Sequence, residues 1–347
     1  MSVAVVLAAS FLLLDGCYYM QAASGHMEVM RNRRPVAEVI DDEATDEVLR
    51  GQLRMVVEAR QFAVDELLLP ENGSYQSYAD LQRDFVVWNV FASPEFSLTP
   101  KTWCYPVVGC VAYRGYFSEE KARKKADHLA RKGLDVSVGG VSAYSTLGRF
   151  DDPVLNTMMR WSDLRLVRTL FHELAHQKLY ISGDSGFNES FATAVAEIGL
   201  DRWIEEKGIP RNEEFDGSLA VLQEEVRNLV DAAREELEEL YASEIGVEEM
   251  RNQKKVFMDR LSSAVQASID ASGTNVHNWL AAPLNNARLV PMSLYEGSLP
   301  AFREIFSGCD KQLSCFYARS EELAGQEFEQ RQESLASFGA AIKSESP

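Results

Sequence analysis

The sequence predicts a mainly helical α+β fold with a small mixed sheet near the middle of the chain. Two observations lead to this prediction. Apolar residues recur at three- and four-residue steps over long stretches toward both ends of the 347 residues, which is typical of amphipathic helices. Between these stretches, residues 85–148 contain short runs rich in β-branched and aromatic side chains, and such runs favour strands.

Changes in this pattern divide the chain into five consecutive regions. We expect a leader, a helical N-terminal region, a core that holds the sheet, a helical C-terminal region and a polar tail that frays. The predicted bounds of these regions are 1–17, 18–80, 81–210, 211–325 and 326–347.

The first 17 residues have the pattern of a targeting segment. Residues 3–14 form an uncharged apolar run that is too short to span a bilayer. The run ends in Leu14-Asp15-Gly16-Cys17, which resembles a bacterial lipobox, where the cysteine is acylated and becomes the new N-terminus. We therefore expect a lipid anchor on Cys17 and a place in the bacterial cell envelope, facing the periplasm. Tyr18 after the cysteine resembles the sorting pattern of the outer membrane. A buried N-terminal helix is the alternative.

The other four cysteines form two local pairs of identical spacing. We predict disulfides between Cys104 and Cys110 and between Cys309 and Cys315, which fit an oxidising compartment such as a periplasm. Four free thiols are the alternative. Neither pair has the two-residue spacing of a zinc knuckle, which argues against a structural zinc site.

The composition is that of an acidic globular protein. Apolar residues make up 46% of the chain, and the formal net charge is −18. Residues 211–250 hold 13 acidic and 3 basic side chains, which we interpret as a solvated helix face. An acidic surface argues against nucleic-acid binding.

The elements before the motif follow from local signals. Helices are expected over 19–33 and 47–69, and a basic amphipathic helix over 118–132, begun by Ser118 and ended by Gly133. Three strands and one further segment, a turn with an edge strand, complete this part of the chain. We predict them over residues 85–91, 111–117, 134–138 and 139–148.

An H-E-x-x-H pattern at residues 172–176 is the strongest chemical signal in the chain. It lies within an apolar-periodic helix that Ser162 or Asp163 begins. His172 and His176, four residues apart, lie on one face and can bind one metal ion, while Glu173 can take a proton from water. A chance match is the alternative.

Glu189 is the predicted third ligand. It follows early in a second helix, expected from residue 187 or 188 to about 206. Two imidazoles and one carboxylate leave the fourth position of a tetrahedral zinc ion open for water, so the predicted cofactor is Zn²⁺. Thr193 and Glu197, one and two turns later, either hydrogen-bond a ligand or serve as surface or core residues.

Two long amphipathic helices follow, over 217–243 and 247–270. They are expected to pack as an antiparallel pair, because each carries a regular apolar stripe. A final helical region comes after them.

Several segments together resemble one bacterial family. They are Thr102–Pro106, Gly109–Phe117, Tyr144–Gly148, His172–Gln177 and Asn188–Ala194. The chain resembles the bacterial predicted-aminopeptidase family of envelope lipoproteins over nearly its whole length, and residues 172–194 resemble gluzincins in general. The resemblance implies a zincin-like catalytic core, with a small mixed sheet and an active-site helix. It also implies a zinc peptidase with His172, His176 and Glu189 as ligands and Glu173 as general base.

The resemblance leaves parts of the site open. Well-known zinc aminopeptidases hold the free amine of the substrate with the Glu of a G-A-M-E-N segment, which this sequence lacks. Tyr144 and Tyr295 are our candidates for the group that stabilises the developing oxyanion. Arg288 either meets a substrate carboxylate or forms a salt bridge in the core. Zinc peptidases commonly bind an extended peptide along a strand edge, for which the predicted edge over 139–148 is the candidate.

The second hypothesis is a catalytically idle envelope protein that uses the zincin scaffold to bind a partner. A retained Glu173 argues against it, because a site that no longer catalyses does not need its base. The sequence predicts neither the peptide specificity nor the oligomeric state.

Overall fold

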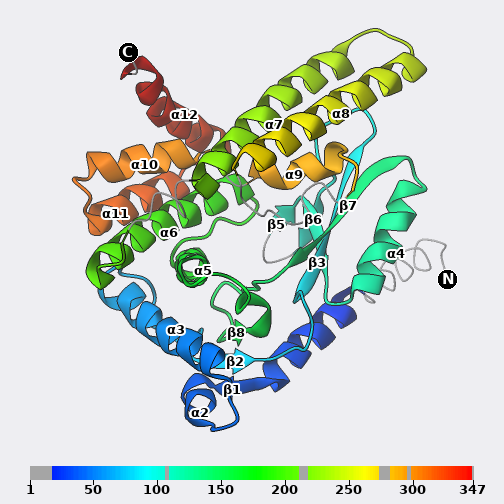
Figure 1. The fold of residues 1–347 in the computed structure, drawn as a ribbon. Helices are drawn as coiled ribbons and strands as arrows, with labels where there is room; N and C mark the ends of the chain where they lie inside the picture. Colours follow the sequence, from blue (N-terminus) through cyan, green and yellow to red (C-terminus); the bar gives the residue numbers. More distant parts are fainter. Residues whose placement is uncertain (1–17, 106–108, 211–217, 273–281, 295–297, 346–347) are drawn as a thin grey trace, which may run out of the picture. The chain divides into compact units, whose positions relative to one another are not determined.

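The computed structural model describes residues 18–105, 109–210, 218–272, 282–294 and 298–345 (Figure 1). The chain forms two compact units, each built from several segments. The first unit holds the described residues up to Val90 together with 114–125 and 138–180. The second holds 91–113, 126–137 and the described residues from Ile181 onward. The protein is mainly helical and its strands form small sheets, as the sequence predicts. The predicted leader lies outside the described residues.

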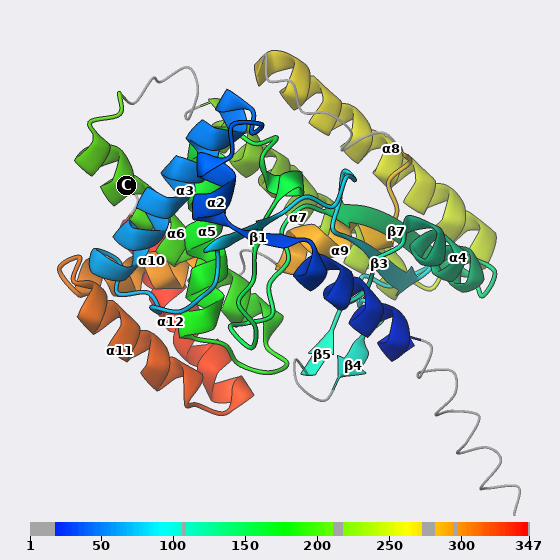
Figure 2. The same cartoon turned by 90° about the horizontal axis from the view of Figure 1, so that it is seen from below.

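Two helices form the core of the first unit. Helix α3 (Glu47–Asp65) begins at Asp46, whose carboxylate accepts hydrogen bonds from two backbone N–H groups of the first turn. It packs against α5 (Asp163–Lys178) (Figure 2). The rings of Phe62 and Phe171 stack, with centroids 5.9 Å apart. A short helix, α2 (Val36–Asp41), precedes α3, and residues 18–31 are also helical.

A three-stranded sheet joins distant parts of the first unit. Strand β2 (Ser77–Ala79) pairs antiparallel with β1 (Arg33–Pro35) and parallel with β8 (Val154–Leu155). These pairings bring the segment before β2 and the loop before β8 to one place, since Tyr78 is opposite Val154. The polar residues discussed below come from these two segments.

The second three-stranded sheet has the order β6-β3-β7. Its strands are β6 (Tyr113–Tyr116), β3 (Val87–Pro94) and β7 (Leu134–Val141), so β7 is an edge strand. The predicted strand over 134–138 is thus longer, while residues 142–148 contain no strand. Of the turn and edge strand expected over 139–148, the strand is wrong beyond Val141, while Leu147 and Gly148 form a turn. Helix α4 (Glu119–Ala130) connects β6 to β7.

Both predicted disulfides are present. Cys104 and Cys110 face each other across the small ladder of β4 (Trp103–Tyr105) and β5 (Gly109–Val111). The other bridge joins Cys309 to Cys315 in the second unit.

The second unit is built from helices. In chain order they are α6 (Ser185–Lys207), α7 (Ser218–Ala242), α8 (Val247–Ser272), α9 (Asn286–Leu294), α10 (Leu299–Gly308), α11 (Leu313–Ala324) and α12 (Phe328–Glu345). Helices α7 and α8 lie side by side as the expected pair (Figure 1). Helix α10 packs against α6, α11 and α12, where the buried rings of Phe187, Phe191 and Phe302 meet.

The prediction of a frayed C-terminal tail is wrong, because residues 328–345 form α12. One physical reason is a buried cation. Arg331 is 4% exposed, and its guanidinium donates a hydrogen bond to Asp184 at 2.9 Å and others to the carbonyls of Ala324 and Gln326. A composition-based reading misses such a contact, since it depends on a carboxylate 147 residues away.

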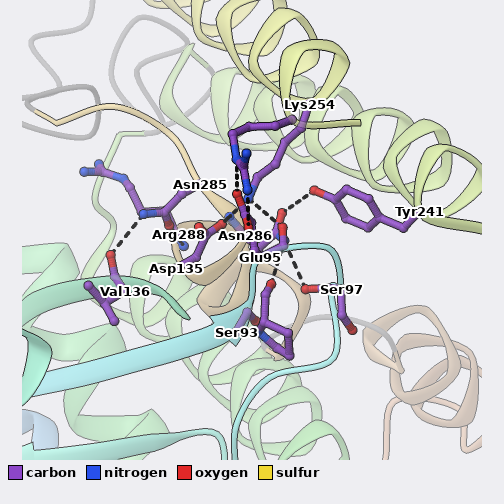
Figure 3. Close-up of polar contacts among 12 residues, drawn as sticks. Ser93, Glu95, Ser97, Asp135, Val136, Tyr241, Lys254, Asn285, Asn286 and Arg288 are labelled. Atoms are coloured by element: carbon purple, nitrogen blue, oxygen red, sulfur yellow. Dashed lines mark hydrogen bonds and ion pairs between the residues drawn. The ribbon is translucent and has the colours of Figure 1, made fainter. Parts of the chain in front are cut away.

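A buried polar cluster in the second unit, which we call the Asn286 network, consists of Asn286, Lys254, Asp135, Glu95 and Tyr241 (Figure 3). Asn286 is fully buried, and its amide donates to the carbonyls of Pro94, Glu95 and Ser97 while its oxygen accepts from Tyr241. Lys254 donates to Asp135 at 2.6 Å and to the Glu95 carbonyl at 2.7 Å. The network attaches the segment after β3 to α8 and α9.

No helix in the described part of the chain is both long and apolar enough to cross a membrane.

Candidate metal centre

Helix α5 presents the H-E-x-x-H side chains because its opposite face is buried. Six apolar residues, none more than 1% exposed, form that buried face: Leu166, Val167, Leu170, Phe171, Leu174 and Ala175. Their burial, in part against α3, fixes the rotation of the helix about its axis. His172, Glu173 and His176 therefore emerge together on the other side.

The two imidazoles converge. Their Nε2 atoms are 3.1 Å apart, and the rings lie nearly perpendicular with centroids separated by 4.7 Å. Two nitrogens that bind one tetrahedral zinc at about 2.0–2.1 Å would be about 3.3 Å apart, so the observed separation suits a shared ion. His176 is buried and His172 is half-buried, which leaves one side of the pair toward solvent.

The start of α6, which carries Glu189, is fixed by two buried polar residues. Asp184 caps the helix, and its carboxylate accepts a hydrogen bond from the N–H of Phe187. The same carboxylate forms an ion pair with Arg331. Asn188 is 1% exposed and bonds to both backbone groups of Ile181, at 2.8 Å and 2.7 Å. Because Asn188 directly precedes Glu189, these contacts hold the backbone at the predicted ligand.

The donor set fits a zinc ion. One ligand atom from each of His172, His176 and Glu189 lies within 4.8 Å of the other two. Two imidazole nitrogens and one carboxylate oxygen are donors that zinc prefers, and three protein ligands are the number found in catalytic sites. The residues that the sequence selects as ligands are thus brought together.

A hydrogen-bonded cluster supports α5 next to the histidines. We call it the α5 network, and its members are Asn72, Ser74, Tyr75, Asp152 and Gln177. Gln177, directly after His176, accepts from the Asn72 amide at 2.7 Å and donates to the Ser74 hydroxyl at 3.3 Å. From α3, the buried Arg60 donates to the carbonyls of Ser74 and Asn72.

Asp152 is a buried acid in this network. Its carboxylate accepts hydrogen bonds from the N–H and hydroxyl of Thr146, at 2.7 Å and 2.8 Å, and from the Ser145 hydroxyl at 3.3 Å. Burial raises the pKa of Asp152 to about 6 against the opposing effect of these donors, and the negative charge of Glu173 raises this pKa further. An acid that is electrostatically coupled to the predicted base belongs to the surroundings of the site.

The sequence reasoning missed the α5 network. Residues 72–74 and Asp152 lie outside every segment singled out from the sequence, and Gln177 enters only as the last residue of the segment His172–Gln177. One signal was available, because Gln177 extends the H-E-x-x-H pattern by one residue on the same helix. Its partners come from distant segments, so their identity requires the fold.

The remaining candidates have different surroundings. The Tyr144 hydroxyl lies 3.4 Å from Nδ1 of His26, and its ring contacts Phe117 with centroids 5.4 Å apart. Burial raises the pKa of Tyr144 to about 12. Tyr295 lies outside the described residues. The role of Tyr144 or Tyr295 as an oxyanion donor stays a prediction.

Three further residues can be placed on helices of the second unit. The Glu197 carboxylate pairs with both arms of the Arg303 guanidinium, at 2.9 Å and 3.0 Å, which favours the structural alternative for Glu197. Thr193 is 5% exposed within α6. Burial lowers the pKa of Arg288 in α9, and both alternatives for this residue stay open.

Comparison with known proteins gives a family match. A family model with the description "Putative aminopeptidase" matches residues 17–335. No curated protein and no solved structure matches the chain. The matched residues include α5, the start of α6 and every member of the α5 network.

Proposed function

The chain belongs to the aminopeptidase family whose model it matches, and from this premise we propose that it is a zinc-dependent peptidase with a zincin-like core of the gluzincin type. The convergence of His172, His176 and Glu189 is the observation that carries the proposal. A family of aminopeptidases acts on peptides, so the substrate is a peptide, and the family description supports cleavage at its free amino end.

The proposed ligands are the Nε2 atoms of His172 and His176 and a carboxylate oxygen of Glu189. A zinc ion held by them supplies Lewis-acid polarisation of a peptide carbonyl and makes nearby water more acidic. Glu173 accepts the proton of the attacking water on its carboxylate and passes it to the departing amine. The order of the residues supports these roles, since Glu173 lies between the two histidines on the same helix. We propose that an extended peptide pairs with the edge strand β7.

The zinc content and the cleavage of peptides test the proposal directly. We expect about one zinc ion per full-length chain. His172→Gln and Glu189→Gln are each expected to weaken zinc binding by more than about a hundredfold, because each removes a ligand and not merely an outer-shell partner. A peptide library digested by the protein and read by mass spectrometry should lose single N-terminal residues. Glu173→Gln should retain zinc while kcat falls by about 10²–10⁴.

Asp163→Asn is the matched control for Glu173→Gln. It also removes one negative charge from α5, but in the first turn of the helix. It should leave zinc binding and kcat unchanged within twofold. Zinc binding with equal cleavage by the wild type and Glu173→Gln would refute the proposed mechanism and favour the idle scaffold that binds a partner. Cleavage of esters but not of peptides would instead indicate a different metal hydrolase.

We further propose that Cys17 is acylated and anchors the protein in the bacterial envelope, at the periplasmic side of the outer membrane. The apolar run over 3–14 and the lipobox-like residues 14–17 support this. Mass spectrometry of the mature N-terminus should find a lipid-modified cysteine, and Cys17→Ser should move the protein from the membrane fraction to the soluble fraction. An unmodified N-terminal Met1 in the membrane fraction would contradict the proposal.

A further inference from the structure

Tyr75 is the least expected member of the α5 network. Its side chain is 1% exposed, and its backbone has a φ of +62°, a conformation that is unfavourable for a bulky residue. The backbone is held there from both sides, because the N–H of Tyr75 donates to the Asp152 carbonyl at 2.6 Å and Arg60 binds the carbonyl of Ser74 at 2.8 Å. Such strain often occurs at functional sites.

The hydroxyl of Tyr75 makes no hydrogen bond of ordinary geometry to any described residue, although it is buried. The Ser145 side chain lies beside it outside that geometry. A buried hydroxyl without a partner is unfavourable, so its retention calls for an explanation. Burial and then the negative charges of Glu173 and Asp152 raise the pKa of Tyr75 well above its ordinary value. The hydroxyl therefore stays protonated and can donate.

The contacts along α5 bring the segment that carries Tyr75 to the helix face of the predicted base. Glu173 and Gln177 are four residues apart, so their side chains are neighbours on one face of the helix. Gln177 is hydrogen-bonded to Asn72 and Ser74, and the segment that ends in Tyr75 therefore runs along this face. The carboxylate of Asp152 already accepts from Ser145 and Thr146, which leaves Glu173 as the acceptor without such donors in this network.

We infer that Tyr75 is a positioning residue whose hydroxyl orients the carboxylate of Glu173 for proton transfer. The inference rests on the proposed function and deepens it. A substrate cannot contact a side chain with 1% exposure, so Tyr75 acts through Glu173 and is no direct oxyanion donor. A hydrogen bond to a catalytic group is often long before substrate binds and shortens in the complex, which agrees with the unpartnered hydroxyl.

Tyr75→Phe removes only the hydroxyl and tests the inference. We expect kcat to fall about 10- to 100-fold, while KM and the dissociation constant for zinc stay within twofold. The metal-free variant should be at least as resistant to urea as the wild type, because an unpartnered polar atom has been removed. In the Glu173→Gln background, Tyr75→Phe should change kcat by less than twofold, since the group that it positions is absent.

Tyr78→Phe is the matched control, because Tyr78 lies three residues along the same segment and is also buried. It should keep kcat within twofold. An unchanged kcat in Tyr75→Phe would overturn the inference, as would a fall in kcat accompanied by weaker zinc binding or lower urea resistance. Additive effects of Tyr75→Phe and Glu173→Gln would also overturn it. A wild type that cleaves no peptide refutes the proposed function itself, whereas each of the other outcomes concerns Tyr75 alone.

Discussion

The Asn286 network and the α5 network are both buried clusters of amides, hydroxyls and charges, yet their hydrogen bonding differs. In the Asn286 network the lysine has both a carboxylate and a carbonyl as partners, and the asparagine amide reaches three carbonyls (Figure 3). In the α5 network the Tyr75 hydroxyl is buried without a hydrogen bond, and burial raises the pKa of Asp152 to about 6. The first cluster is complete, and the second is not.

The difference separates two uses of buried polar groups. A fully bonded cluster fixes one arrangement of the chain and offers nothing to a ligand. A cluster that buries an unpaired hydroxyl and a carboxylate of raised pKa is unfavourable for folding. Proteins keep such groups mainly where the chemistry of a site requires them. We therefore expect substitutions in the Asn286 network to act on stability, and substitutions in the α5 network to act mainly on zinc-dependent cleavage.

Asp135→Asn should give the largest effect on stability. It removes the carboxylate that is hydrogen-bonded to the buried Lys254, and the side chains of this pair are only 17% and 10% exposed. Removing one partner of a buried ion pair typically lowers the free energy of unfolding by about 3–5 kcal/mol. Urea unfolding of the metal-free protein measures this loss. The kcat of the folded fraction should be unchanged.

Asp259→Asn provides the control for that experiment. Asp259 pairs with Lys255 on α8, but both side chains are largely exposed, at 66% and 76%. Its loss should lower the free energy of unfolding by less than about 0.5 kcal/mol. Equal losses in the two variants would contradict the view that burial gives the Asn286 network its structural role.

Arg331→Met should have the next largest effect and tests whether a buried ion pair outside both networks can also support the metal site. It leaves Asp184 buried without its cation, and each side chain of this pair is 5% exposed. We expect the free energy of unfolding to fall by about 3 kcal/mol. Because Asp184 caps the helix that carries Glu189, zinc affinity measured by competition with a chelator should also weaken about tenfold. Unchanged zinc affinity in the folded variant would limit Arg331 to stability.

Asp152→Asn should change how stability depends on pH. The native pKa of Asp152 is about 6, whereas the unfolded carboxyl titrates near 3.8. Between these values the native protein keeps a proton that the unfolded chain has lost, so this group lowers stability as pH rises from about 4 to 6. The contribution is about 1–3 kcal/mol, and the asparagine variant lacks it. Urea unfolding of both metal-free proteins at pH 4, 5 and 6 should therefore show the variant gaining on the wild type with rising pH. A constant difference would contradict the raised pKa.

The sequence predicts the elements of this fold well where the signal is local. The periodicity over 47–69 and 247–270 corresponds to α3 and α8, and the cysteine spacing corresponds to both disulfides. The end of β7 and the helical C-terminal segment were predicted wrongly, because they depend on distant partners. Arg331 illustrates this. The polar sequence around it predicts an exposed side chain, whereas in the fold the side chain is buried against Asp184.

The same distinction applies to the candidate site. His172, Glu173 and His176 are four residues apart or fewer, so helix periodicity alone brings them together. Glu189 was a prediction from spacing, and the structure brings it to the histidines. Tyr75 and Asp152 approach α5 through the pairing of β2 with β8 and through the contacts of Gln177 and Arg60, which no local pattern encodes. Residues that act through another residue are for this reason the hardest to find in a single sequence.

Gln177→Ala should have the smallest effect on stability and tests the α5 network at its link to the helix. The substitution removes the acceptor of the Asn72 amide and a weak donor to Ser74, which lowers the free energy of unfolding by about 1 kcal/mol. The kcat should nevertheless fall about threefold to tenfold, because the segment that ends in Tyr75 loses its attachment beside Glu173. Gln253→Ala is the control, since Gln253 bonds an exposed Glu249 on α8 and should change neither quantity noticeably. A loss of stability without a loss of kcat in Gln177→Ala would give the α5 network the same purely structural role as the Asn286 network, and the contrast between them would no longer hold.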